Sequence, residues 1–74
     1  MQKWEYLFVE ADWIGDYWYP RYLNTVELPN WNKGQQLAIY ANELGKQGWE
    51  LVSAPYVHTG SYTRPSLIFK RSLE

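Results

Sequence analysis

Alternation of apolar and polar positions near the start of the chain predicts two β-strands joined by a turn. Residues 3–11, KWEYLFVEA, are rich in aromatic and β-branched side chains and lack glycine and proline, as is typical of a strand. Gly15 and Asp16 then indicate a turn, and we expect residues 17–28 to form a second strand. Because Pro20 has no backbone N–H to donate, this second strand should lie at an edge of the sheet.

A helical period replaces the alternation in the middle of the chain. Residues 33–47, KGQQLAIYANELGKQ, carry one apolar stripe at helical spacing, formed by Leu37, Tyr40, Ala41 and Leu44. Asn32 is the expected N-cap. Gly48 suits the left-handed position just past the end of a helix, which predicts that Trp49 packs back on Leu44.

Two more strands are expected after the helix. Residues 49–57, WELVSAPYV, and residues 62–71 have strand-like composition, and residues 59–61 between them suit a hairpin turn. Leu67 and Phe69 are the bulkier apolar set of the last strand, so we expect them to face the core. The same inner layer is expected to hold three rings of the first strand, namely Trp4, Tyr6 and Phe8.

These elements predict a single α+β domain spanning residues 1–74. The expected architecture is a small antiparallel β-sheet of three to four strands in ββαββ-like order, with one α-helix packed on one face. A chain of this length is too short to build two separate cores. Residues 73–74, Leu-Glu, resemble a cloning remnant, so we infer nothing from them.

Composition limits how so small a domain can be stabilised. Cysteine is absent and His58 is the single histidine, which excludes disulfides, thiolate metal sites and multi-histidine metal sites. The chain instead holds five Trp, seven Tyr and two Phe. Each ring can bury roughly 150–250 Å². We therefore expect heavy aromatic packing, oligomerisation or both.

Charge and motifs argue against several classes of function. The net charge of −1 gives no reason to expect duplex nucleic acid or a membrane as a partner. A signal-peptide pattern and a run of about 20 apolar residues are both missing, so we expect a cytoplasmic protein. His58 has no acid close to it in sequence, the serines lack a nucleophile-elbow context, and the glycines are scattered. We therefore expect no catalytic residues, no metal, no cofactor and no enzymatic activity.

Three segments of the chain resemble a known protein family. KWEYLFVE at residues 3–10, ANELGKQGWELVSA at residues 41–54 and LIFKR at residues 67–71 occur in this order and at similar spacing in small bacterial proteins. In these segments the chain resembles the domain of unknown function 4177 family. The resemblance covers most of the chain and implies a compact ββαββ-like α+β domain. It implies no activity and no catalytic residues.

The aromatic stretch DWIGDYWYPRY, residues 12–22, is the part least similar to that family. Its ligand-binding or interface candidates are five rings and one base: Trp13, Tyr17, Trp18, Tyr19, Arg21 and Tyr22. One hypothesis makes these residues a lid or a subunit interface, because Tyr and Trp combine an apolar body with a polar tip. The other makes them a stacking platform for a flat ligand whose anionic group pairs with Arg21.

A second apolar surface indicates a partner. We expect five residues on the face of the sheet away from the helix, where they would merge into a patch: Leu7, Val9, Val52, Ala54 and Ile68. The leading prediction is a small non-enzymatic interaction domain that forms a homo-oligomer, a dimer or larger, through its sheet and aromatic segment. The alternative is a protein that binds or sequesters a nucleotide-like small molecule through stacked rings and Arg21. In size and composition it would be comparable to the oligomeric sponges that phages use against nucleotide signals of host defence.

Overall fold

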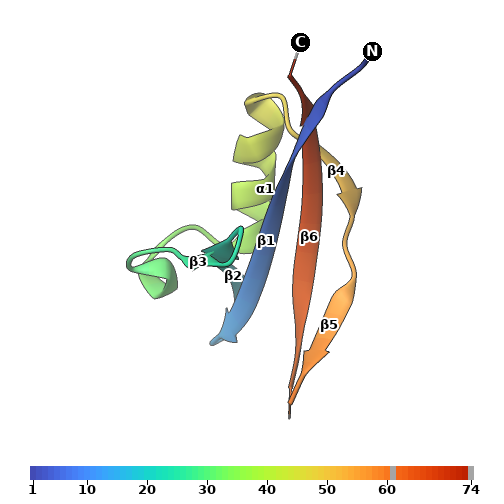
Figure 1. Ribbon diagram of the computed structural model, residues 1–74. Coiled ribbons are helices and arrows are strands. Elements are labelled where there is room, and N and C mark those ends of the chain that lie inside the picture. The colour runs from blue at the N-terminus through green and yellow to red at the C-terminus, as the bar shows by residue number, and fades with distance from the viewer. Residues whose placement is uncertain (61, 74) are drawn as a thin grey trace.

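An antiparallel β-sheet with one α-helix on one face forms the domain (Figure 1). The computed structural model describes residues 1–60 and 62–73. The strands are β1 (Trp4–Ile14), β2 (Tyr17–Leu23), β3 (Val26–Glu27), β4 (Glu50–Ser53), β5 (Tyr56–Thr59) and β6 (Tyr62–Ser72). The helices are the 3₁₀ turn η1 (Trp31–Lys33) and α1 (Leu37–Lys46). The predicted α+β class with a small antiparallel sheet and one α-helix is confirmed.

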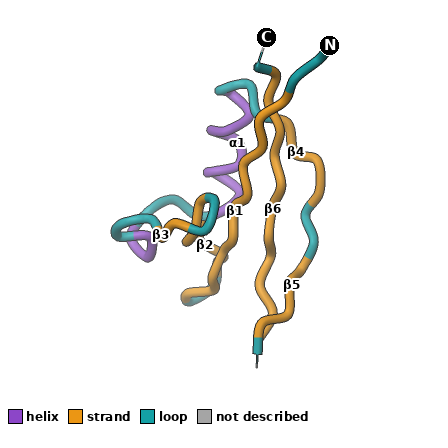
Figure 2. Tube along the Cα trace, viewed as in Figure 1, coloured by secondary structure: helices purple, strands orange, loops and turns teal. Residues whose placement is uncertain are grey.

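The number and order of strands differ from the prediction of three to four strands in ββαββ-like order. The described residues form six strands in the spatial order β3-β2-β1-β6-β4, and β5 also pairs with β6 (Figure 2). One extra strand arises where Asn24 and Thr25, with φ of 50° and 71°, turn the chain back on β2. The other arises because the predicted strand 49–57 is divided at Pro55, which offers no backbone N–H.

β2 is shorter than the predicted strand 17–28, and β3 pairs with only part of it. Pro20 is buried and lies opposite Ala11 of β1. β3 pairs with β2 only at Tyr22 and Leu23, so Pro20 lies in the uncovered part of β2. The predicted edge position of the second strand was therefore wrong, because β3 flanks β2, although Pro20 itself lies where β3 does not pair. A bulge next to Pro20 leaves Arg21 as the extra residue of β2.

The helix begins later than residues 33–47 predict. α1 starts at Leu37 and its N-cap is Gln36, which makes no side-chain capping bond, while the predicted cap Asn32 lies in η1. Gly34 is extended, with φ of −88° and ψ of −160°, and this separates the 3₁₀ turn from the helix.

The end of the helix matches the prediction. Gly48 has φ of 93°, and the Trp49 N–H donates to the Leu44 carbonyl at 3.0 Å. Trp49 packs against the core cluster that contains Leu44, as expected.

The core lies between α1 and the centre of the sheet. The face of β1 that contributes to this core is the opposite of the predicted face. Val9 lies opposite Leu67 and Leu7 opposite Phe69, so Leu7 and Val9 share the helix-facing side with the buried pair of β6. The inward placement of Leu67 and Phe69 is confirmed. The inward placement of the first-strand rings was wrong, as was the outward placement of Leu7 and Val9. Side chains of α1 fill the space over the sheet, namely Leu37, Tyr40, Ala41 and Leu44, and β1 adds compact aliphatic side chains there.

Candidate functional site

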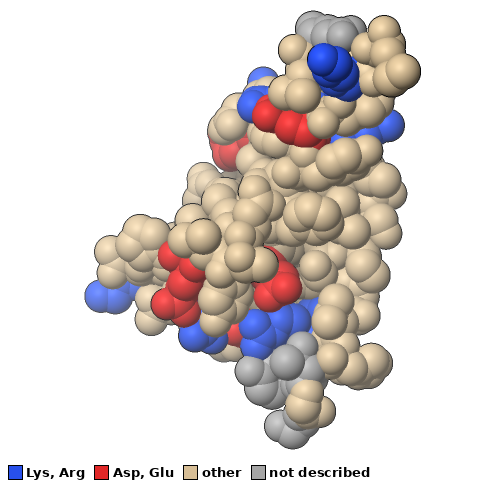
Figure 3. All heavy atoms as spheres, viewed as in Figure 1, with Lys and Arg blue, Asp and Glu red and all other residues tan. Residues whose placement is uncertain are grey.

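Three rings of β1 stand on the face of the sheet away from α1. Trp4, Tyr6 and Phe8 keep 40%, 51% and 46% of their surface exposed. Ile68 of β6 lies beside Phe8 on the same face. In Figure 3 the charged side chains gather towards the two ends of the molecule, and an uncharged surface lies between them. This apolar sheet face, formed by these four residues, is the first candidate site.

Basic side chains at both ends of the sheet are held by rings and carboxylates. Lys70 lies over the Trp4 ring, with its Nζ 4.2 Å from the centroid. Arg64 is buried, and its guanidinium lies 3.6 Å from Asp12 and 4.0 Å from Glu10. These contacts give the basic residues of β6 structural partners within the chain.

The tip of the β1–β2 hairpin is the second candidate site and contains the aromatic stretch. Gly15, with φ of 62°, takes the position at which a type II′ turn places glycine, so β1 and β2 continue to the tip. Trp13 lies opposite Trp18, their ring centroids 5.1 Å apart and their planes at 72°. Trp18 also meets the ring of Tyr56 edge-on at 6.2 Å. The indoles therefore form a cluster across the end of the sheet.

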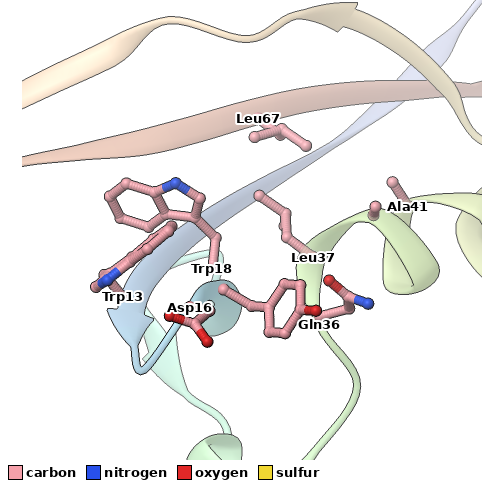
Figure 4. Close-up of a pocket in the computed structure, with 9 residues that line it drawn as sticks. Trp13, Asp16, Trp18, Gln36, Leu37, Ala41 and Leu67 are labelled. Atoms are coloured by element: carbon pink, nitrogen blue, oxygen red, sulfur yellow. The ribbon is translucent and has the colours of Figure 1, made fainter.

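A cavity of about 310 Å³ lies between this hairpin tip and the start of α1. Figure 4 shows the indoles of Trp13 and Trp18 on one side, Leu37 and Ala41 on the other, and the Asp16 carboxylate near the indoles. The remaining lining residues are Tyr17, Gln36, Ala38 and Leu67. We call this space the tip cavity.

A second hollow of about 370 Å³ shares two walls with the tip cavity. Its lining residues are Asp12, Trp13, Trp18, Arg21, Trp31 and Thr63. Here the structure brings Arg21 together with two of the predicted rings and adds Trp31. Trp31 follows the Pro-Asn break in the sequence, and nothing in the local pattern indicated that it would fold back towards β2.

Arg21 is already bound on several sides. Its guanidinium donates to Asp12 at 2.8 Å and to Glu27 at 2.8 Å. These hydrogen bonds, the one to Asp12 first, raise the pKa of Arg21 above its usual range. The guanidinium also lies over the rings of Trp31 and Tyr22, at 4.7 and 5.2 Å from their centroids. The predicted pairing of Arg21 with a ligand anion would compete with these contacts.

The six predicted site residues thus fall into two groups. Trp13, Tyr17 and Trp18 line the tip cavity. Arg21 belongs to the ion-pair network, Tyr22 packs under its guanidinium, and Tyr19 lies opposite Asp12 in the strand pairing. Sequence reasoning missed Asp16 as a lining residue, although its place in the turn directly beside Tyr17 was a usable signal.

Groups suited to metal binding or nucleophilic chemistry are sparse. Within residues 1–60 and 62–73, the structure places no three His, Asp or Glu side chains together as a metal site. His58 is exposed on β5, and its Nδ1 lies 2.7 Å from the Thr63 hydroxyl.

Comparisons with family models, curated proteins and solved structures find no match to this chain. The resemblance to the domain of unknown function 4177 family therefore stays a prediction. Among the described residues, the structure contains no helix of the length and apolar character needed to cross a membrane.

Proposed function

We propose that the protein is a non-enzymatic interaction domain that forms a homodimer through its apolar sheet face. The observation that carries this proposal is the exposure of Trp4, Tyr6 and Phe8, three consecutive outward positions of β1. At the exposed fractions given above, these rings show on the order of 300 Å² to solvent. This area is comparable to the largest apolar patch of a typical monomer, a feature that is often functional, and Ile68 extends the patch.

A second copy of the chain suits this face because the core is small. In the described chain the buried hydrophobic core holds only five side chains: Val9, Ala11, Leu44, Leu67 and Phe69. The other buried apolar residues of the described chain are Pro20 and Pro65. A stable interface buries about 800 Å² per partner, roughly 15% of the 5162 Å² surface of this chain. Burial of the sheet face in a dimer would supply stability that a single chain of this size lacks.

The edges of the sheet support face-to-face rather than edge-to-edge association. On one side, Pro55 divides β4 from β5, and the pairing with β6 is irregular between Leu51 and Ser53. On the other side, β3 has only two residues. Short, bulged and proline-interrupted edges are poor templates for adding a strand.

The charges around the face complement each other under two-fold symmetry. Lys70 lies beside Tyr6, while Glu10 lies two residues beyond Phe8 on the same face. A two-fold axis that crosses β1 at Phe8 brings Lys70 of one copy close to Glu10 of the other. Opposite charges at the rim would then favour the antiparallel arrangement.

Native mass spectrometry tests the proposal with a matched pair of variants. We expect the wild type to give the mass of two 8.9 kDa chains. Phe8→Lys, which places a charge in the centre of the face, should give the mass of one chain. Ile39→Lys is the control, because Ile39 is equally exposed, at 43%, but lies on α1. A wild type that stays monomeric at high micromolar concentration, or equal dissociation by both variants, would contradict the proposal.

The alternative, a nucleotide-binding or sequestering protein, has weaker support. The hollow lined by Trp31 and Arg21 offers rings for stacking. However, Asp12 lines the same hollow, and both Asp12 and Glu27 already neutralise the guanidinium. Titration of adenosine monophosphate against wild type and Arg21→Gln tests this alternative. It requires that the wild type binds adenosine monophosphate and that the variant does not.

A further inference from the structure

We propose that the tip cavity binds a small organic cation, such as an alkylated ammonium group. Of the described residues that line it, Asp16 is the only charged one. Three of the others are aromatic and four are aliphatic, and the amide of Gln36 is the remaining polar side chain. A cavity with these walls has no basic group to hold a phosphate or carboxylate.

The two indoles supply the geometry that a cation needs. Trp13 and Trp18 pack edge to face at 72° and both line the cavity, and Tyr17 adds a third ring to the lining. Tryptophan faces attract cations more strongly than those of any other side chain, and cages of several rings are the usual recognition mode for alkylated ammonium groups. The volume of about 310 Å³ suits a ligand at the small end of the range for binding sites.

Asp16 and the helix start act on a charged ligand in opposite directions. The amino end of α1, at Leu37, carries about half a positive charge from the helix dipole, which favours anions. Asp16 carries a full negative charge, and it lines the cavity from the exposed hairpin turn. The carboxylate outweighs the dipole, so the net field favours a cation.

The apolar walls fix the chemical class further. Leu37, Ala41 and Leu67 close the side of the cavity that faces the core (Figure 4). A bare metal ion or an unsubstituted ammonium would lose its water there without gaining polar ligands. Methyl or other alkyl groups on the nitrogen remove this cost, because they pack against apolar carbon.

Nuclear magnetic resonance of the indole N–H groups tests the proposal on the intact chain. The probes are choline and its uncharged carbon analogue 3,3-dimethylbutanol, with adenosine monophosphate as the anionic probe. We expect choline to shift the Trp13 and Trp18 signals in a saturable way, with about tenfold tighter binding than the uncharged analogue. The Trp4 signal should stay in place, which separates this site from the proposed dimer face, and so should the signal of Trp49, which packs against the core.

Two variants with a matched control locate the binding. Asp16→Asn keeps a residue suited to the turn and should weaken choline binding up to about fivefold, as for an exposed ion pair. Ala38→Leu fills the cavity from an exposed helical position and should abolish binding while the chain stays folded. Glu43→Gln removes a carboxylate from another part of α1, where it pairs with Lys46, and should leave binding unchanged.

Three results would overturn the proposal. Equal binding of choline and its uncharged analogue would make the cavity a purely apolar site. Preferential binding of adenosine monophosphate would give the cavity the opposite charge preference. Unchanged Trp13 and Trp18 signals with all three probes, at millimolar concentration, would show that it binds no small cation.

Discussion

Arg21 makes several contacts that join different parts of the hairpin region. It joins β1 through Asp12 and the chain beyond β2 through Glu27, and it lies between two rings. Because its side chain is about one third exposed, solvent screens these ion pairs in part. The interactions of Arg21 are therefore expected to stabilise the fold modestly, in addition to any role in binding.

Removal of the Arg21 charge tests this interpretation. Arg21→Gln should lower the free energy of unfolding by about 1 kcal/mol, since two hydrogen bonds between charged groups are lost at a partly exposed site. Lys46→Gln is the control, because its pair with Glu43 is exposed and should contribute less than about 0.5 kcal/mol. Urea denaturation measures both, and equal effects of the two substitutions would contradict the prediction.

Tyr40 gives the protein a specific response to alkaline pH. Burial raises the pKa of Tyr40 above its ordinary value of 10.0, because the phenolate would lose hydration. The folded state thus holds this proton more tightly than the unfolded state. The stability that comes from keeping Tyr40 protonated is fully present below pH 10. It declines as the pH rises above 10 towards the pKa of Tyr40 in the folded state.

Comparison of the wild type with Tyr40→Phe isolates this effect. Phe keeps the ring in the core cluster but has no proton to lose, so the variant should lose less stability than the wild type between pH 9 and 11. Urea denaturation across this range measures the difference. Parallel loss in both proteins would mean that the Tyr40 hydroxyl ionises as readily in the folded state as in the unfolded one.

At the scale of elements, the two glycines at the end of α1 have opposite roles. Gly48 has φ of 93°, which an L side chain rarely adopts, whereas a Cβ at Gly45 would meet no atom within 4 Å. Gly48→Ala should therefore destabilise the protein by about 1 kcal/mol or more. Gly45→Ala should stabilise it by about 0.5–1 kcal/mol, because alanine favours the helix. Thermal denaturation measures both shifts, and shifts of the same sign would contradict the assignment of the left-handed cap.

The sequence predicted where elements end or turn when the backbone conformation depends on a single residue type. Gly48 marked the end of α1, and Gly15 with Asp16 marked the hairpin turn. The start of α1 was harder, because Asn32 is a good capping residue that the chain uses in a 3₁₀ turn instead. The order of apolar residues could not reveal this choice, which depends on how Trp31 packs against Arg21.

The facing of β1 could not be predicted from its own sequence. All of residues 4–9 except Glu5 are apolar or aromatic, so alternation alone allows either side to be buried. The register with β6 decides the matter, since it places Leu7 and Val9 beside Phe69 and Leu67. The preference for burying the larger rings gave the wrong answer, because α1 already occupies the space above the sheet. The tip cavity was equally out of reach, because residues 13–18 and 36–41 meet only in the folded chain.

At the scale of the whole molecule, association and stability should be coupled. If the sheet face is buried only in the dimer, the midpoint of urea denaturation should rise with protein concentration. We expect a measurable rise over a hundredfold range for the wild type and none for Phe8→Lys. A wild-type midpoint that is independent of concentration would show that association, if present, contributes nothing to folding.

The pairing of β1 with β6 also determines when the chain can fold during its synthesis. These strands lie next to each other at the centre of the sheet, with Trp4 opposite Ser72, although they come from opposite ends of the described chain (Figure 1). The core needs Leu67 and Phe69, so it cannot close before residue 69 has left the ribosome. Until then Leu7 and Val9 of β1 lack their partners on β6. The nascent chain therefore cannot complete its core until β1 pairs with β6. Contacts between segments so far apart in the sequence are the slowest kind to form.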